Sequence, residues 1–235
     1  MSSAVKIFQG RFGRVALLDM DAPLVGHAHH HCHILLKAGG ADSAFIVRGE
    51  RAPLTDGSAV LVNAWAPHSY EHDLAAGANT LILALYIEPP WLAEIQHSLT
   101  LSGHPRFFPK TCVEVTAATR KVTEEFVLEL WWADEVSPYR LENLLFNLII
   151  AVIDSYSGWR DLASLLRSKP PVSMDPRIRQ AIAIMKQDVA HDLGFAAPGH
   201  FSRFFRQHLG ITPSDYRRVV NLFEPPPARS NADLI

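Results

Sequence analysis

The spacing of apolar residues changes near residue 88 of this 235-residue chain, and that change constrains the fold more than any single motif. Before it, short apolar runs separated by turn residues recur at regular spacing, which predicts a small β-sandwich or barrel. Pro89 and Pro90 interrupt the last run, and the apolar residues beyond them recur at helical spacing. The sequence therefore predicts an α+β protein in two parts, an N-terminal β-barrel with following helices and a C-terminal all-α region.

The expected elements follow from these two periods. We expect strands at residues 5–8, 14–20, 27–37, 44–47, 59–63, 69–73 and 80–87, and helices at residues 91–99, 114–132 and 139–156. The helix at 139–156 is apolar on almost every side, which is unusual for a helix on a protein surface. One of its faces should pack on the barrel and another on a second helix. We predict that this segment forms a homodimer, with an intramolecular helical layer as the alternative.

Alternating histidines mark the expected strand at 27–37. On an extended strand the following four side chains share one face: His27, His29, His31 and His33. His68 and His72 follow two strands later, and the interior of a barrel can bring them to the same place. Three imidazoles suit zinc, iron, nickel or copper, so the candidate metal ligands are His29, His31 and His68. The candidate effector pocket consists of His29, His31, His33, Trp65 and His68.

The stretch 188–217 has the pattern of two short helices joined by a tight turn. Gly194 ends the first helix, because glycine adopts a positive φ without strain, and Pro198 suits the first turn of the second helix. Phe201 and Phe205 lie on one face of that second helix, which leaves polar and basic side chains on its other faces. Such a helix fits the major groove of DNA. From spacing alone, a solvated basic hairpin is an equal alternative.

This stretch resembles the second helix-turn-helix of AraC-type transcriptional regulators. The resemblance rests on D-V-A-H-D-L-G-F, F-S-R-F-F-R and G-I-T-P-S-D-Y-R, which keep the order and spacing of that signature over about thirty residues. It implies that the start of the second helix faces the groove, through Pro198, Gly199, His200 and Arg203. The full set of candidate DNA-binding residues is Pro198, Gly199, His200, Ser202, Arg203, Arg206 and Arg217.

The N-terminal part resembles the cupin small barrel, which carries His-x-His on one strand and a further histidine on a later strand. AraC-type regulators often use such a barrel to bind an effector, and the helices beyond it commonly dimerise. Metal-binding cupins usually carry a glutamate a few residues after His-x-His, whereas residues 34–37 of this chain include no carboxylate. An effector pocket without a cofactor is therefore the favoured interpretation, and a transition metal held by the histidines is the alternative.

The resemblance divides the chain into an effector-binding barrel at 1–88, a connecting and dimerisation segment at 89–169, a DNA-binding region at 174–222 and a disordered tail at 223–235. A complete AraC-type region carries two helix-turn-helix units and runs to about a hundred residues, but the interval from Pro171 to Tyr216 has room for about half of that. The first unit is therefore missing. We expect residues 176–193 to form one fused helix and DNA binding to be weakened.

Charge and cysteine content narrow the class of protein. The net charge of −2 means that any basic patch is local, and the wide separation of Cys32 and Cys112 suggests a reducing compartment. The N-terminus lacks the apolar run of a signal peptide, and no run is long enough to span a bilayer. We therefore expect a cytoplasmic regulator, not an enzyme, that binds DNA and a small-molecule effector and has no membrane partner. The alternatives are a metal-dependent cupin enzyme of the dioxygenase or isomerase type, and a sensor or dimerisation module that does not bind DNA.

Overall fold

The computed structural model describes residues 2–72, 77–96, 99, 102–132 and 137–159, together with residues 202, 203, 205–207, 212 and 213 of the C-terminal region. Contacts between residues divide the chain into two compact units, 1–173 and 174–235, and each unit is described by itself. The boundary between them coincides with residue 174, the expected start of the DNA-binding region. The expected fused helix at 176–193 and the expected tail at 223–235 lie outside the described residues.

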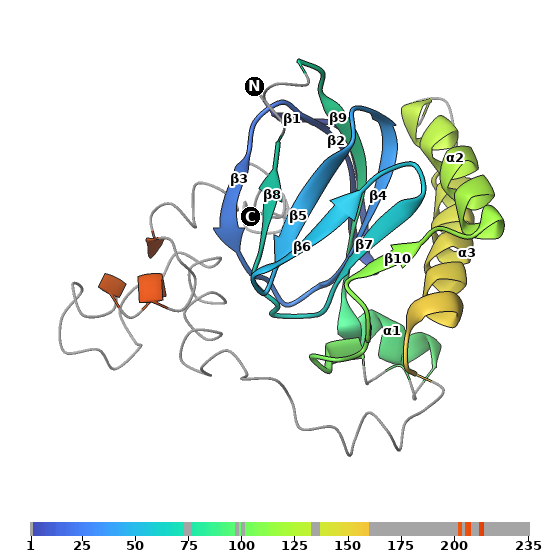
Figure 1. The fold of residues 1–235 in the computed structure, drawn as a ribbon. Helices are drawn as coiled ribbons and strands as arrows, with labels where there is room; N and C mark the ends of the chain where they lie inside the picture. The colour runs from blue at the N-terminus through green and yellow to red at the C-terminus, as the bar shows by residue number, and fades with distance from the viewer. Residues whose placement is uncertain are drawn as a thin grey trace, which may run out of the picture. The chain divides into compact units, whose positions relative to one another are not determined.

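Two antiparallel sheets form the β-structure of the N-terminal unit (Figure 1). The larger sheet has the strand order β1-β2-β9-β4-β7-β10, and the smaller sheet has the order β3-β8-β5-β6. The strands are β1 Ser3–Gly10, β2 Gly13–Met20, β3 Leu24–His27, β4 Cys32–Gly40, β5 Ser43–Val47, β6 Glu50–Leu54, β7 Ser58–Val62, β8 His68–Glu71, β9 Thr80–Ile87 and β10 Cys112–Glu114. The α+β class and the β-rich N-terminal part predicted from the sequence are confirmed.

Helices cover the outer face of the larger sheet (Figure 1). They are α2 Ala117–Trp131 and α3 Pro138–Tyr156, whereas α1 Pro89–Ile95 follows β9 at one end of the sheet. Helix α2 begins where the Thr116 hydroxyl accepts a hydrogen bond from the Thr119 backbone N–H, at 3.1 Å. Helices α2 and α3 pack on each other, and one continuous apolar core joins them to the sheet. That core includes Val15, Leu17, Ile34, Leu36, Leu83, Leu85, Phe126, Leu130, Leu145, Leu148, Ile149 and Val152.

The central strands of the larger sheet are buried on both faces. Alternate residues of β2, β4 and β9 belong to the core shared with the helices, and the residues between them are also mostly buried, because the smaller sheet faces them. This arrangement explains why these strands appear in the sequence as nearly continuous apolar runs. At one end of the interior, β4 and β9 of the larger sheet face β3 and β8 of the smaller sheet.

The prediction of one strand over residues 27–37 is wrong. Strand β3 ends at His27 and β4 begins at Cys32, because residues 28–31 carry the chain from the smaller sheet to the larger one. Two strands were also missed. Pro53 and the charged residues around it hide β6, which is an edge strand and so tolerates proline. The three-residue strand β10 delays the start of the following helix from the expected residue 114 to Ala117.

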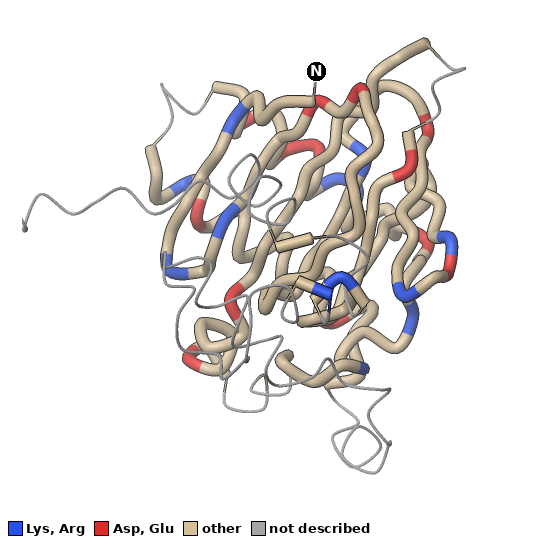
Figure 2. The backbone as a smooth tube through the Cα atoms, turned by 90° about the vertical axis from the view of Figure 1, so that its left-hand side faces the viewer, with Lys and Arg blue, Asp and Glu red and all other residues tan. Residues whose placement is uncertain are grey.

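Charged residues are spread over the described surface. Figure 2 shows basic and acidic positions interspersed along the strands rather than separated onto different faces. Within the described part of the chain, no helix combines the length and the hydropathy that a membrane crossing requires.

Candidate functional site

Five buried histidines meet inside the N-terminal unit, and we call them the histidine cluster. The members are His27, His29, His31, His33 and His68. The antiparallel pairing of β3 with β8 places His27 directly opposite His68 on the smaller sheet. His33 comes from β4 of the larger sheet, and the crossing segment at 28–31 contributes the remaining two.

The rings of the cluster are in close contact. The ring centroids of His27 and His68 are 4.3 Å apart, and His29 lies 4.9 Å from His68 and 5.1 Å from His33. The ring of His31 is 5.2 Å from that of His29. The structure therefore brings the predicted histidines together, although the crossing segment does this rather than alternation along one strand. His72 is not part of the cluster, and its Nδ1 lies 3.2 Å from the Tyr70 hydroxyl.

Backbone carbonyls fix the tautomers of two cluster members. Nδ1 of His27 donates to the carbonyl of Val25 at 3.0 Å, and Nδ1 of His68 donates to the carbonyl of Ala66 at 2.9 Å. A carbonyl can only accept, so each Nδ1 carries the proton and each Nε2 presents a lone pair. Nε2 of His68 lies 3.4 Å from Nδ1 of His33.

His29 lies at the centre of the cluster, and its ring nitrogens have no hydrogen-bond partner among the described residues. Its side chain is 3% exposed, and neither Nδ1 nor Nε2 contacts a donor or acceptor there. A neutral imidazole always carries one N–H, and leaving such a group buried and unpaired costs about 1–3 kcal/mol. His29 is therefore a candidate for binding a ligand.

An aromatic side chain and a buried cation lie next to the cluster. The ring of Tyr86 stacks on His33 with centroids 4.1 Å apart, and the guanidinium of Arg14 lies 5.3 Å from the Tyr86 ring. Both side chains project from the larger sheet, where Arg14 and Tyr86 are paired across β2 and β9.

Sequence reasoning missed one residue of the site, Glu88. Its Oε1 accepts hydrogen bonds from Nε2 of His30 and Nε2 of His31, each at 3.0 Å. The pairing of Cys32 with Ile87 brings the residue after β9 beside the residue before β4. Glu88 reaches the site only through the pairing of two strands that are far apart in the chain. A single sequence does not reveal that pairing.

Burial controls the protonation of the site. Burial lowers the pKa of His29, His33 and His68 well below the ordinary value, and the neighbouring imidazoles lower it further, so these rings are neutral near pH 7. Burial raises the pKa of Glu88, but the hydrogen bonds from His30 and His31 outweigh this effect and hold it below its usual range. Burial also raises the pKa of the Cys32 thiol to about 12, which makes it a structural thiol.

Trp65 positions the crossing segment. Its backbone N–H donates to the carbonyl of His29 at 2.7 Å, and its φ of 63° is unusual for a residue other than glycine. The indole lies 6.1 Å from His30, outside the closely packed rings of the cluster. Trp65 therefore acts on the site through the backbone of His29.

The described residues contain two groups with the composition and spacing of a metal site. One is His27, His29 and His68, and the other is His30, His31 and Glu88; in each, the potential ligand atoms lie within 4.8 Å of one another. The combination expected from the sequence, His29, His31 and His68, is thus divided between the two groups. Imidazoles alone favour a transition metal, and a carboxylate with two imidazoles has the donor set of a zinc or iron site.

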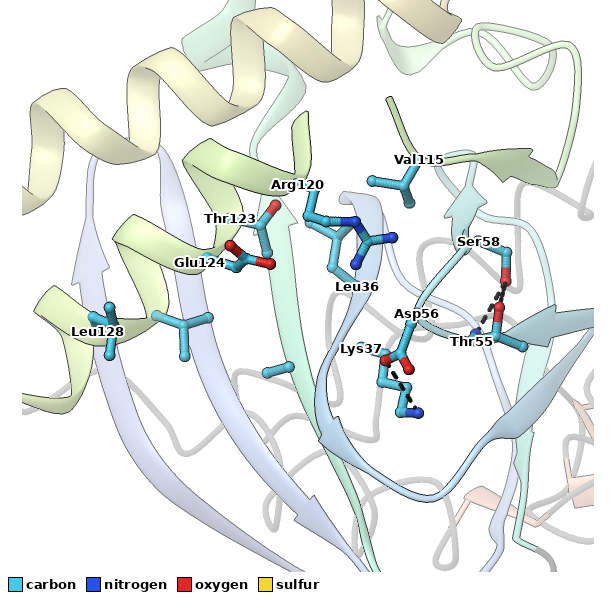
Figure 3. Close-up of a pocket in the computed structure, with 12 residues that line it drawn as sticks. Leu36, Lys37, Thr55, Asp56, Ser58, Val115, Arg120, Thr123, Glu124 and Leu128 are labelled. Carbon is cyan, nitrogen blue, oxygen red and sulfur yellow. Dashed lines mark hydrogen bonds and ion pairs between the residues drawn. The ribbon is translucent and has the colours of Figure 1, made fainter. Parts of the chain in front are cut away.

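A separate pocket of about 390 Å³ lies between α2 and the edge formed by β4 and the β6–β7 turn (Figure 3). Lys37 and Asp56 form one side of it, and their side chains are paired at 3.2 Å. Arg120 and Glu124 project from α2 on the opposite side, with Leu36 between them and the sheet. None of the residues that line this pocket belongs to the histidine cluster, and no motif in the sequence indicated it.

Few of the candidate DNA-binding residues are described. Residues 202, 203 and 205–207 are helical, in agreement with the expected second helix. The side chains of Arg203 and Arg206 are exposed, Ser202 is half-buried, and Phe205 is fully buried. The predicted separation of basic side chains from the apolar face is therefore confirmed at these positions.

Comparison with known families also indicates a helix-turn-helix in the C-terminal region. Residues 178–219 match a family model described as a helix-turn-helix domain. This segment is an AraC-type helix-turn-helix region. The AraC-type region contains the candidate residues Pro198, Gly199, His200 and Arg217, which lie outside the described residues.

A comparison with solved structures finds similar proteins, and the first of them shares the fold of this chain. The fatty-acid-bound crystal structure of ToxT from Vibrio cholerae strain SCE256 has 11% sequence identity and a TM-score of 0.50, and covers 92% of this chain and 96% of its own. ToxT from Vibrio cholerae O395 has 13% identity and a TM-score of 0.49, with 87% and 96% covered. The protein TT1209 from Thermus thermophilus has 20% identity and a TM-score of 0.33, with 37% and 85% covered. No curated protein matches the chain.

Proposed function

We propose that this protein is a DNA-binding transcription regulator whose N-terminal unit senses a small effector at the histidine cluster. The observation that carries the proposal is the AraC-type helix-turn-helix match at residues 178–219. The exposed Arg203 and Arg206 support it, because arginines on a recognition helix contact phosphates and base edges. The effector site is proposed at the cluster because His29 is buried there with both ring nitrogens unpartnered among the described residues.

The proposed DNA contacts are few, and this limits the affinity. The segment from 174 to 222 offers one helix-turn-helix, and one unit reaches one segment of the major groove. We therefore expect weak, salt-sensitive binding that depends on dimerisation, since two linked units on one duplex gain effective concentration.

Replacing Arg203 by alanine should remove most of the DNA binding, because Arg203 is one of a small number of cationic contacts. Fluorescence anisotropy on a duplex selected from a random pool, titrated at several salt concentrations, measures both affinity and its salt dependence. The slope of log affinity against log salt should fall in magnitude by about one in Arg203→Ala.

Arg11→Ala is the matched control, because it removes an exposed arginine from the N-terminal unit. It should leave both affinity and slope unchanged. Tight, sequence-specific binding that persists at moderate salt would show that a second helix-turn-helix is not needed. An unchanged affinity in Arg203→Ala would refute the role of the recognition helix.

We also propose that the regulator is a homodimer through residues 139–156. Tyr139 and Phe146 of α3 are exposed, while the rest of the apolar surface of that helix is mostly buried in the core. Multi-angle light scattering at micromolar concentration should give the mass of a dimer, and Phe146→Asp should shift it toward the monomer. Glu142→Ala, at an exposed position of the same helix, should not. A monomeric unmodified chain would end the proposal.

A further inference from the structure

We propose that the pocket between α2 and the larger sheet binds a free α-amino acid with an apolar side chain. This is the pocket of about 390 Å³ drawn in Figure 3. The described residues that line it include none of the histidine cluster, so the site goes beyond the effector site proposed above and does not depend on it. Three features support it: walls that are already in place, two charged groups without partners among the described residues, and an apolar surface next to them.

The walls of the pocket are held by hydrogen bonds within the protein. In the β6–β7 turn, the Thr55 backbone N–H donates to the Ser58 hydroxyl at 3.0 Å, and that hydroxyl donates to the Pro53 carbonyl at 2.8 Å. The Val115 backbone N–H donates to the carbonyl of Gly57 at 2.9 Å, which ties the residues before α2 to the same turn. A ligand that enters such a pocket has few protein groups to order, so little of its binding free energy is lost.

On the sheet side of the pocket, the charge of Lys37 is satisfied within the protein. Its side chain is 6% exposed, and its Nζ lies 2.6 Å from Asp42 and 3.2 Å from Asp56. Burial opposes the positive charge of Lys37, but its hydrogen bonds to the two carboxylates outweigh burial and raise its pKa. A ligand would have to compete with these carboxylates for Lys37, so we expect the α2 side of the pocket to recognise it.

Two charged side chains on the α2 side have no such partner among the described residues. Arg120 is half-buried and Glu124 is exposed, and neither makes an ion pair or a side-chain hydrogen bond there. They stand one helical turn apart, a spacing that places Cβ atoms roughly 5–6 Å from each other. An arginine N-terminal to a glutamate is the less favourable order for a pair within a helix, which agrees with their separation. Both charges are therefore available to a ligand.

An α-amino acid carries the complementary pair of charges. Its carboxylate can accept two parallel hydrogen bonds from the guanidinium of Arg120, and its ammonium can donate to the carboxylate of Glu124. The charged residues that line the pocket are two positive and two negative: Lys37, Asp56, Arg120 and Glu124. A zwitterion leaves this balance unchanged, whereas a simple acid leaves Glu124 unpaired and a simple amine leaves Arg120 unpaired.

The surface next to these charges is apolar. Leu36 of β4 is buried, Val115 and Val127 are half-buried, and all three line the pocket. Figure 3 shows Leu36 beside the Arg120 side chain. An aliphatic or aromatic side chain of the ligand would contact these groups while its charged end faces Arg120 and Glu124. The volume lies near the lower end of the range of about 300–1,000 Å³ found for small-molecule sites, which suits a ligand the size of one amino acid.

Titration calorimetry of the full chain with L-leucine and with L-phenylalanine tests the site. We expect at least one of them to bind, with one molecule per chain. Analogues of the tighter ligand that lack one charge are then titrated: isocaproic acid and isopentylamine for leucine, or hydrocinnamic acid and phenethylamine for phenylalanine. Each analogue should bind at least about tenfold more weakly, because it loses the charge-assisted hydrogen bonds at one end.

Variants of α2 assign the two charges of the ligand. Arg120→Ala and Glu124→Gln should each weaken binding of the amino acid by at least about tenfold. Lys121→Ala and Glu125→Gln are the matched controls, because both are exposed neighbours on α2 that do not line the pocket, and they should bind normally. Arg120→Lys should be intermediate, since an ammonium keeps the charge without the two parallel bonds. Circular dichroism checks folding, and Arg120→Gln replaces Arg120→Ala if that variant does not fold.

Four results would overturn the proposal. The first is no binding of either amino acid at about 10 mM, where a site with a millimolar Kd is mostly filled. The second is an equal loss of affinity in Lys121→Ala and Arg120→Ala. The third is a simple acid that binds as tightly as the amino acid, which would refute the role of Glu124. The fourth is loss of binding in His29→Ala with full binding in Arg120→Ala, which would place the amino acid in the histidine cluster. DNA affinity enters none of these measurements, so failure of this pocket is distinguishable from failure of the proposed function.

Discussion

Replacing Phe126 by alanine should lower the free energy of unfolding by about 3–5 kcal/mol. Phe126 lies at the centre of α2, is completely buried, and belongs to the core that joins α2 and α3 to the larger sheet. Removing its ring leaves a cavity between a helix and a sheet, and the packing of α2 on α3 limits how far the helix can move inward to fill it. Urea denaturation followed by circular dichroism measures the loss.

Leu128→Ala is the matched control for this prediction. Leu128 lies two residues further along the same helix and is 64% exposed, so its truncation should change the free energy of unfolding by less than about 0.5 kcal/mol. Equal losses in the two variants would show that α2 does not pack on the sheet through Phe126. A large difference would support the packing of α2 on the larger sheet through Phe126.

The bounds of helices and strands were predicted correctly where neighbouring residues alone determine them. Strand β9 has the predicted bounds, because a long β-rich run is ended by Pro89 and Pro90. Helix α3 begins within one residue of its predicted start, since Ser137 and Pro138 form a clear N-terminus, and it ends at the predicted Tyr156. These signals depend only on neighbouring residues, so a single sequence contains them.

Elements that depend on distant partners could not be predicted. The break between β3 and β4 has no turn signal of its own, because residues 28–31 continue the histidine alternation while the chain passes from one sheet to the other. The predicted proximity of the histidines was nevertheless confirmed for all of them except His72. A continuous strand and a segment that crosses between the two sheets both direct these side chains inward, so the sequence indicated the cluster even though the predicted strand was wrong.

The position of Glu88 also depends on a distant partner, and for that reason it could not be predicted. The cupin pattern places a carboxylate a few residues after the histidines, and residues 34–37 of this chain do not provide one. The carboxylate that the structure places against His30 and His31 comes from the end of β9, more than fifty positions later. It reaches them because the register of β4 on β9 pairs Cys32 with Ile87. Strand register is set by the packing of whole faces, and one sequence does not specify it.

Replacing Gly13 by alanine should destabilise the protein by at least about 3 kcal/mol, because two separate costs add. Gly13 has a φ of 114°, which side chains other than glycine rarely adopt. An alanine Cβ there would also overlap the carbonyl oxygen of Tyr86 on the paired strand β9. That overlap is with backbone, so no side-chain rotation relieves it.

Gly49→Ala separates the cost of the positive φ from the cost of the overlap with the Tyr86 carbonyl. Gly49 also has a positive φ, 84°, but apart from its chain neighbours no described atom lies within 4 Å of the position that a Cβ would take. Its substitution should cost only the backbone strain, about 1–2 kcal/mol. Thermal and urea denaturation of both variants give the difference, and equal losses would contradict the overlap with Tyr86.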